Sequence, residues 1–530
     1  MRIYRCTNYG ECSIADRREV LELPAGAPAL CPDPSCRRPL VDLEIEPNSS
    51  LAVPTLQVPS DGRASGVKAV VLLLIVAAAG FAGWMFFQGK HGPESSSGAP
   101  SAQPVVSGPT AATPEVVLRM VGSNTIGSQL GPDLAAAFLQ KNGANLTPAT
   151  KSTGLDETVV SAAFGATGRK SIQISAHGSA TAFEALAKGV AEIGMSSRPV
   201  KPAEVDQLQD CGDMTRSTNE QVIGIDGIAV IVSRDNPIES LTMEQLAAIF
   251  SGRITDWKEV SKRAGRINLY ARNSEKSGTF EIFQSKVLGG AKISVIAARE
   301  EDSVKLSDAV AQDPDAIGFV GFPFVRQAKP LSIAEAHGTA LLPTRFTLAT
   351  EDYPLARRLY LYTCTTKNAI TRQFLDFVDG PEGQAIVEKD GFVSLNIDAQ
   401  KVIAPSTAPA RYRSLTAGTR RLSVNFRFRS GSKELDNKAE RDVDRVIQFL
   451  ADPQNTAGTV MLLGFADSTG PAAVSRKLSE ERAATVAEAL RMRGVKPEVV
   501  AGFGPEIPIA SEASDEGRAR NRRVEVWVRN

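Results

Sequence analysis

An almost unbroken apolar run from Val70 to Phe87 divides the chain into two parts. With the preceding alanine it covers about 19 residues, and as a helix rising 1.5 Å per residue it matches the roughly 30 Å hydrocarbon core of a bilayer. Trp84 and Phe86 stand near its end, where interfacial aromatic residues are favoured. A buried core helix is disfavoured because no polar face interrupts the run. A cleavable signal peptide is disfavoured because it would begin at the N-terminus and have a shorter apolar region. We therefore expect one transmembrane helix over residues 69–88.

The composition limits the other classes of protein. A chain of 530 residues has room for three or four domains. Its formal net charge is zero and 23% of its residues are charged, so no basic field favours nucleic acid as a partner.

Four of the six cysteines precede the apolar run as two close pairs: Cys6, Cys12, Cys31 and Cys36. Thiolates paired in this way close a tetrahedral zinc site, and a segment this small could not otherwise bury a stable core. The Cys-x5-Cys and Cys-x4-Cys spacings are looser than the usual CxxC. The segment resembles a small zinc ribbon, so we expect residues 1–46 to bind Zn²⁺, with disulfides or free thiols as the alternatives.

Charge and cysteine placement predict the orientation of the span. Zinc thiolates need a reducing compartment, and Arg63 and Lys68 flank the run on the same side, whereas only Lys90 follows closely on the other. We expect a single-pass inner-membrane protein with a cytoplasmic N-terminus and periplasmic C-terminal domains. Cys211 and Cys364 would then meet oxidising conditions, either as a disulfide or as two buried thiols.

Composition shifts divide the rest of the chain. A Ser-, Pro-, Gly- and Ala-rich stretch has few apolar side chains to offset the entropy of ordering it, so it predicts a flexible tether. Alternating strand and helix signals follow it, and the fold class that we predict is a multidomain α/β protein. The predicted segments are a linker at 47–68, the tether at 89–115, a large domain at 116–400, a linker at 401–420 and a small α+β domain at 421–530.

Three short Ser/Thr/Gly stretches in the large domain each stand where a strand gives way to a helix. They are VGSNTIG at 121–127, HGSATAFEALAKG at 177–189 and KSGTFEIF at 276–283. A helix start has unpaired N–H groups and a partial positive charge, and each stretch adds hydroxyls that donate to oxygen. Three such ends that converge would bind phosphate or another oxyanion.

The large domain resembles the substrate-binding proteins of phosphate ABC transporters over Val116 to Ile397. The resemblance is carried by GSATAFEALAKGVAEIGMSSRPV, by the block from Leu241 to Trp257 (LT-x-x-QL-x-x-IF-x-G…W) and by the Ser-Gly-Thr that follows. It implies a two-lobed periplasmic-binding-protein fold with hinge strands, a ligand cleft and an ABC permease as partner. The second lobe would cover roughly 228–317.

The resemblance implies a set of ligand residues. In chain order they are Ser123 with Asn124, Thr125, Ser179, Ser197, Arg272, Ser277, Gly278 and Thr279. Arg272 stands one residue further from the serine than in the family. Ser197 replaces an aspartate that accepts a hydrogen bond from protonated phosphate in phosphate-binding members. The implied ligand is therefore phosphate or a similar oxyanion, and a cleft that has lost its ligand is the alternative.

The C-terminal segment resembles the OmpA-like peptidoglycan-binding domain over Leu422 to Val528. It carries GFADSTG, LS-x-x-RA, GFG and GRARNRRVEV. The resemblance implies that Asp467 accepts from the ammonium group of diaminopimelate and that Arg482 pairs with its carboxylate. Arg522 and Asn521 would support the loop at the end of the domain.

Together these expectations indicate a binding protein. The chain has three histidines and shows no nucleophile elbow, Walker loop or metalloprotease helix, so we expect no enzyme. We expect a membrane-anchored periplasmic solute-binding protein tethered to peptidoglycan. A transmembrane sensor and an envelope scaffold are the alternatives.

Overall fold

The computed structural model describes residues 2–5, 20–23, 31, 41–42 and 114–529, apart from 155, 166–167, 274–277, 337, 366–367, 430 and 456–457. The chain divides into two units, Met1–Val105 and Val106–Asn530. In the first, β1 (Arg2–Arg5) pairs antiparallel with β2 (Val20–Leu23) and β3 (Val41–Asp42). Cys31 is buried.

Two of the predictions fall largely outside these residues. The expected zinc ligands Cys6, Cys12 and Cys36 and the expected span at 69–88 are not among the described residues. Within the part of the chain that is described, no helix has the length and apolar character needed to cross a bilayer. Zinc binding and the membrane span both stay predictions.

One long sheet organises residues 114–400 and continues through two lobes. Its order is β12-β11-β13-β9-β16-β8-β4-β7-β6-β5, with β14 paired to β9. The strand β9 (Glu220–Val232) pairs with β16 (Ala356–Tyr362) as far as Gly227, and with β13 (Ala316–Gly321) from Ile228 onward. It therefore passes from one lobe to the other, and β9 and β16 form the hinge.

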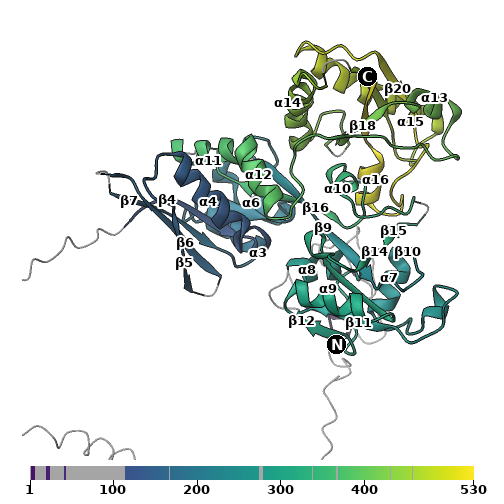
Figure 1. Ribbon diagram of the computed structural model, residues 1–530, viewed down its shortest axis with the longest axis horizontal. Coiled ribbons are helices and arrows are strands. Elements are labelled where there is room, and N and C mark those ends of the chain that lie inside the picture. Colours follow the sequence, from purple (N-terminus) through teal and green to yellow (C-terminus); the bar gives the residue numbers. More distant parts are fainter. Residues whose placement is uncertain are drawn as a thin grey trace, which may run out of the picture. The chain divides into compact units, whose positions relative to one another are not determined.

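The first lobe packs helices on strands whose polar ends form the candidate site. The strands β7 (Arg169–Ser175), β4 (Glu115–Gly122) and β8 (Ile193–Ser196) are neighbours and parallel. Their carboxyl ends meet at one edge, where ligands bind in sheets of this kind. In Figure 1 the helices α4, α11 and α12 gather over this lobe. Phenylalanine rings of α4 and α11 pack in the core of this lobe, where the ring centroids of Phe138 and Phe374 lie 5.2 Å apart. The remaining elements of the lobe are α3 (Asn124–Gly127), α4 (Leu130–Lys141), β5 (Ala149–Gly154), β6 (Glu157–Ala163), α5 (Ser179–Ala187), α6 (Pro202–Gln207), α11 (Ala369–Asp379) and α12 (Pro381–Lys389).

The second lobe is built around a cluster of three aromatic rings. Phe283 of α8 (Gly278–Lys286) stacks on Phe319 of β13 with centroids 3.8 Å apart, and Phe250 of α7 (Met243–Phe250) meets both edge-on. This packing fixes α8, so that its first residues face the first lobe. The other elements are β10 (Ser240–Thr242), β11 (Asn268–Arg272), β12 (Ala298–Glu300), α9 (Ser303–Gln312), β14 (Lys329–Pro330), β15 (Ser332–Ala334) and α10 (Arg345–Ala349).

The C-terminal segment forms a five-stranded sheet in the order β17-β18-β21-β19-β20. Its strands and helices are β17 (Ala399–Gln400), α13 (Ala410–Thr416), β18 (Arg420–Phe426), α14 (Asn437–Ala451), β19 (Thr459–Gly464), α15 (Ala472–Arg491), β20 (Val499–Gly502), α16 (Asp515–Asn521) and β21 (Val524–Arg529). The expected linker at 401–420 differs from the structure because it contains α13. Tyr412 of α13 is buried against this domain, and its hydroxyl donates to Glu525 Oε2 at 2.8 Å.

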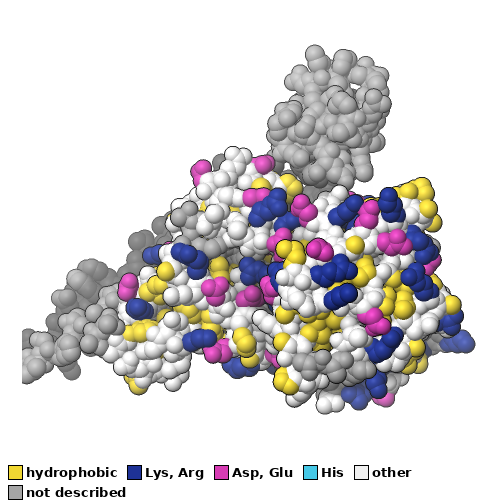
Figure 2. Space-filling view, turned by 90° about the horizontal axis from the view of Figure 1, so that it is seen from above, with side chains coloured by type: hydrophobic (Ala, Val, Ile, Leu, Met, Phe, Trp, Pro, Cys, Tyr) yellow, Lys and Arg dark blue, Asp and Glu magenta, His cyan; other side chains and the backbone are white. Residues whose placement is uncertain are grey.

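A disulfide joins Cys211 to Cys364. Of the two alternatives left open by the sequence, the structure has the bridged form. It ties the turn before β9 to the residues after β16, so it closes one end of the hinge pair. Acidic and basic side chains are interspersed over the face of the molecule seen in Figure 2, in keeping with the zero formal net charge of the chain.

Candidate functional site

Two turns of the first lobe are held together by backbone hydrogen bonds. Ser123 N donates to the carbonyl of Met195 at 2.8 Å, and Gly178 N donates to the carbonyl of Gly122 at the same distance. Gly122 has φ +140°, and a Cβ there would lie 2.0 Å from the Met195 oxygen, so only glycine fits. The turns after β4 and β7 are therefore fixed beside the end of β8.

Ser179, at the start of α5, and Ser197, directly after β8, contact each other at the carboxyl ends of these strands. Both are buried. Ser179 Oγ accepts a hydrogen bond from Ser197 N at 3.1 Å, and the two hydroxyl oxygens lie 3.2 Å apart. Ser179 opens α5, whose first N–H groups have no partner within the helix.

The second lobe reaches the same point through the start of α8. A Cβ built on Gly278 would lie 2.3 Å from Thr125 Oγ1 and 3.4 Å from Arg357 Nη2, so the Gly278 backbone rests against both side chains. Thr279 follows in the first turn of α8. Ser277 lies outside the described residues. The structure therefore brings Thr125 of the first lobe against Gly278 of the second lobe, with Ser123, Ser179 and Ser197 at the adjoining strand ends of the first lobe; we call these five the cleft residues.

Arg357 and Asp226 are two site residues that the sequence did not reveal. They are direct cross-strand partners on the hinge strands β16 and β9, and both are buried. Arg357 donates to Asp226 Oδ2 through Nε at 2.9 Å and through Nη2 at 2.7 Å, and Nη2 also donates to Thr125 Oγ1 at 2.9 Å. A charged residue inside each apolar strand, in GIDGIAVIV and LARRLYLY, was the available signal.

Arg272 does not join this group through any contact among the described residues. It lies in the second lobe, where its Nη1 donates to the hydroxyl of Ser303 at the start of α9. Burial lowers the pKa of Arg272, although the carboxylates at 300–302 oppose that effect. Its buried Nε has no hydrogen-bond partner among the described residues.

The second candidate site lies in the C-terminal domain around Asp467 and Arg482. Asp467 Oδ2 accepts from Arg522 Nη1 at 2.8 Å. Burial raises the pKa of Asp467, but hydrogen bonds from Arg522 and Thr469 outweigh it and hold that pKa below its usual value. The Arg482 guanidinium is buried and lies 5.4 Å from the Phe428 ring centroid. Burial and the nearby Arg522 lower the pKa of Arg482.

The two residues expected to support the terminal loop differ in role. Asn521 does hold the loop, because its side chain accepts from the backbone of Ile509 and Ala510 and donates to Ala510 O. Arg522 instead ion-pairs with Asp467, so it belongs to the site.

Family models match both parts of the chain. The model of the PBP superfamily domain matches residues 109–382, more than half of the sequence. The chain belongs to the PBP superfamily. A model of the OmpA family matches residues 427–522. We refer below to the PBP domain and the OmpA-family domain.

Several relatives of the PBP domain carry one name. The phosphate-binding protein PstS of Pseudomonas aeruginosa is 31% identical over 242 residues, which cover 42% of this chain and 74% of that protein. The PstS of Staphylococcus epidermidis is 28% identical over 299 residues, 54% of this chain and 87% of the relative. Among solved structures, an ABC-type phosphate transport receptor from Vibrio cholerae is 22% identical, with 52% of this chain and 99% of that one covered and a TM-score of 0.41.

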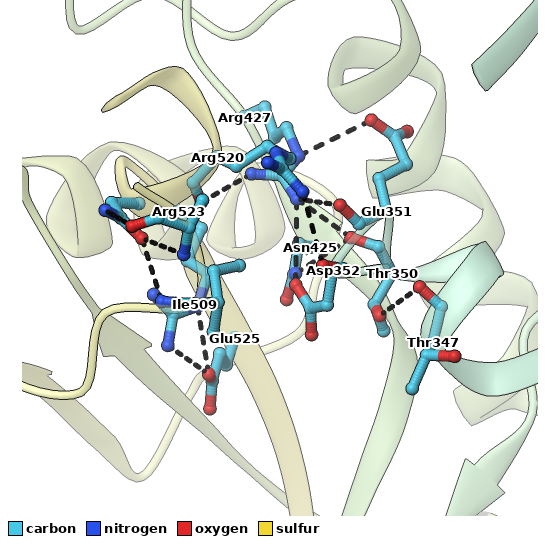
Figure 3. Close-up of polar contacts among 12 residues, drawn as sticks. Thr347, Thr350, Glu351, Asp352, Asn425, Arg427, Ile509, Arg520, Arg523 and Glu525 are labelled. Carbon is cyan, nitrogen blue, oxygen red and sulfur yellow. Dashed lines mark hydrogen bonds and ion pairs between the residues drawn. The ribbon is translucent and has the colours of Figure 1, made fainter. Parts of the chain in front are cut away.

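The OmpA-family domain is bonded to the hinge of the PBP domain. Asn425 Nδ2 donates to Asp352 Oδ1 at 2.7 Å and to the carbonyl of Thr350 at 2.9 Å, and Arg427 Nη2 donates to that same carbonyl at 3.0 Å (Figure 3). Asp352 lies four residues before the first residue of β16. The polar contact between the domains is therefore made at the base of a hinge strand.

The same domain also contacts both lobes. On the first lobe, Asn437 Nδ2 donates to Glu220 Oε1 at 2.8 Å, and Arg445 pairs with Asp379. On the second lobe, Arg520 pairs with Glu335, and Ser511 N donates to Glu335 Oε2 at 2.8 Å. The OmpA-family domain thus spans the hinge from one lobe to the other.

A cavity of about 600 Å³ opens between α11 and α14, lined in part by Glu220, Arg372 and Arg441. None of the five cleft residues lines it. We assign the candidate ligand site to the cleft residues, because there side chains of the first lobe, the start of α8 in the second lobe and Arg357 of the hinge meet.

Proposed function

We propose that this chain is a membrane-anchored periplasmic protein that captures phosphate or a similar oxyanion and is tethered to peptidoglycan. The single observation that carries the proposal is the meeting of Thr125, Gly278 and Arg357, which joins one lobe, the other lobe and the hinge at one point. The names of the PstS relatives support phosphate as the ligand class. An oxyanion there would replace water on hydroxyl, helix-end and guanidinium donors.

The OmpA-family domain supplies the tether in this proposal. Asp467 and Arg482 carry opposite charges near one another, which suits a ligand with an ammonium and a carboxylate. The Cys211–Cys364 disulfide supports an oxidising compartment such as the periplasm. The apolar run at 69–88 would anchor the chain in the inner membrane with the zinc-ribbon-like segment in the cytoplasm, and an ABC permease would receive the captured anion.

Isothermal titration of the full-length chain, purified in detergent, tests capture. We expect one anion bound per chain, with loss of binding in Thr125→Val. A matched control is Thr181→Val, because the Thr181 hydroxyl only donates to the carbonyl of Gly178 within the α5 turn. Absence of heat with phosphate and with other oxyanions would remove the proposal.

One observation favours a sensor as a second candidate. The OmpA-family domain is bonded to the hinge and to both lobes, so closure of the cleft would shift or strain contacts such as Arg520–Glu335. Peptidoglycan affinity would then differ between the empty and the loaded protein. Sacculus binding measured with and without phosphate decides, and equal affinities would leave capture as the function.

A further inference from the structure

The hydrogen bonds in the cleft give its hydroxyl groups a direction. Arginine has donors only, so Thr125 Oγ1 must accept from Arg357 Nη2, and the threonine proton is left to point elsewhere. Ser179 Oγ likewise accepts from Ser197 N, so its proton goes either to Ser197 Oγ or to a ligand. The Thr125 hydroxyl is therefore available to a ligand as a donor, and so is the Ser179 hydroxyl whenever its proton does not go to Ser197 Oγ.

The one carboxylate among the contacting residues has no oxygen free of donors. Asp226 Oδ1 accepts from Gly227 N at 2.8 Å, while Oδ2 accepts from Arg357 Nε and Nη2. A proton on an enclosed ligand oxygen would find only hydroxyl lone pairs as acceptors. Such a proton would also face the guanidinium, which repels the positive end of an O–H dipole.

Arg357 has a donor left for the ligand. Its Nη1 makes no hydrogen bond with any residue that the structure describes, although its side chain is only 6% exposed. An anionic oxygen would accept a charge-assisted hydrogen bond from this group. Gly278 lies against Nη2 of the same guanidinium, so Nη1 belongs to a side chain that sits where the two lobes meet.

We propose that the cleft selects an oxyanion without a proton on its enclosed oxygens, which is either sulfate or the phosphate dianion held with its single hydroxyl outside the enclosed oxygens, and that Arg357 sets this selection through Thr125. The inference rests on the proposed function, since it requires that the cleft bind an oxyanion. In this inference Arg357 has two roles: it donates a hydrogen bond directly to the ligand, and its hydrogen bond to Thr125 Oγ1 sets the direction in which the Thr125 hydroxyl donates. Sulfate and phosphate dianion should thus bind with affinities within about tenfold of each other.

Titration of the full-length chain with sulfate and with inorganic phosphate across pH tests the inference. Sulfate keeps its charge through the neutral range, whereas phosphate gains a proton as the pH falls. We expect the phosphate affinity to fall toward acid pH in step with the dianion fraction and the sulfate affinity to stay constant. A change in the protein itself would move both curves together, so sulfate serves as the internal control.

Four variants separate selection from a structural role. Ser197→Asp adds an acceptor and a like charge, so it should weaken sulfate at least about a hundredfold relative to phosphate. Ser197→Ala should leave the ratio of the two affinities unchanged. Arg357→Gln should weaken both anions and shift the ratio toward protonated phosphate. Because removal of one partner of a buried pair endangers folding, Thr125→Ser, which keeps the hydroxyl, is the conservative variant and should retain the wild-type ratio.

The outcomes are distinguishable. Binding of phosphate without sulfate, or a phosphate affinity that does not fall in acid, would overturn the selection while the proposed capture function stands. Binding of neither anion would overturn both. Equal weakening of sulfate and phosphate binding by Ser197→Asp would also contradict the proposed selection, because a purely structural effect has no preference for the unprotonated ligand.

Discussion

Arg421 Nη2, on the first long strand of the OmpA-family domain, donates a hydrogen bond of 3.0 Å to Asp352 Oδ2 at the base of hinge strand β16. Both side chains are more than nine-tenths buried. The pair joins the domain expected to hold the cell wall to the segment that a ligand-induced closure would move. Its burial sets the scale of the first prediction.

Asp352→Ala should destabilise the chain by about 3–5 kcal/mol, because it takes one carboxylate away from the buried guanidinium groups of Arg421 and Arg427, which keep contacts of 3.5 Å to Glu525 and Glu351. The free energy of unfolding in urea measures the effect. As a control, Asp133→Ala removes the partner of Lys389, an ion pair whose lysine is 70% exposed, and should cost less than about 1 kcal/mol. Equal costs for the two variants would show that the domains are not joined through Asp352.

Acid should weaken the contact between the domains. Burial raises the pKa of Glu351, but Arg358, Lys438 and Arg427 outweigh it, so the folded-state pKa lies below the usual value of 4.5. A carboxylate with a lowered pKa contributes stability that is fully present above the unfolded-state pKa and is lost as the pH falls through the folded-state pKa. Thermal unfolding should therefore show stability falling from about pH 4.5 downward, and Glu351→Gln should flatten that slope. An unchanged slope in the variant would contradict the assignment.

Loss of the disulfide should destabilise the PBP domain. Cys211 and Cys364 are separated by 153 residues, and removing a native bridge typically costs about 2–5 kcal/mol. The double variant Cys211→Ala, Cys364→Ala should unfold at lower urea in non-reducing buffer, and it should match the wild type once both are reduced. A wild type that is insensitive to reductant would show that the bridge does not form in solution.

Removal of either charged residue of the C-terminal site should release the protein from sacculi. Asp467→Ala and Arg482→Ala each delete one end of the recognition pair, and each should weaken binding at least about tenfold, the scale of one charge-assisted hydrogen bond. Arg491→Ala is a matched control on the same helix α15, because its partner Glu488 is exposed. Co-sedimentation with purified sacculi gives the comparison. Retention of both site variants at the level of the control would exclude this site.

The local parts of the cleft were predictable from the sequence, since each turn is a short motif that begins a helix. Ser123, Thr125, Ser179 and Gly278 come from such motifs, whereas Ser197 came from the family resemblance; in the structure Thr125 meets Gly278, and Ser179 meets Ser197. Arg357 and Asp226 were not predictable because the pair is non-local: 131 residues separate them, and their contact depends on the register of β16 against β9.

The contact between the domains was hidden for a related reason. Arg421, Arg427 and Asp352 each look like ordinary solvated charges in the sequence, and only the tertiary structure buries them against one another. The segment 401–420 looked like a linker because its apolar residues are few, yet Tyr412 and Leu415 pack α13 against the core of the domain. Arg272 shows the opposite case, where a motif position proposed for the ligand pairs with Ser303 instead.

Equilibrium dialysis of the full-length chain against radiolabelled phosphate tests the central claim most directly. The account predicts saturable binding at one site per chain that unlabelled sulfate displaces and that the Thr125→Val variant loses. Phosphate distributed equally across the membrane, or saturable binding that Thr125→Val leaves intact, would contradict it.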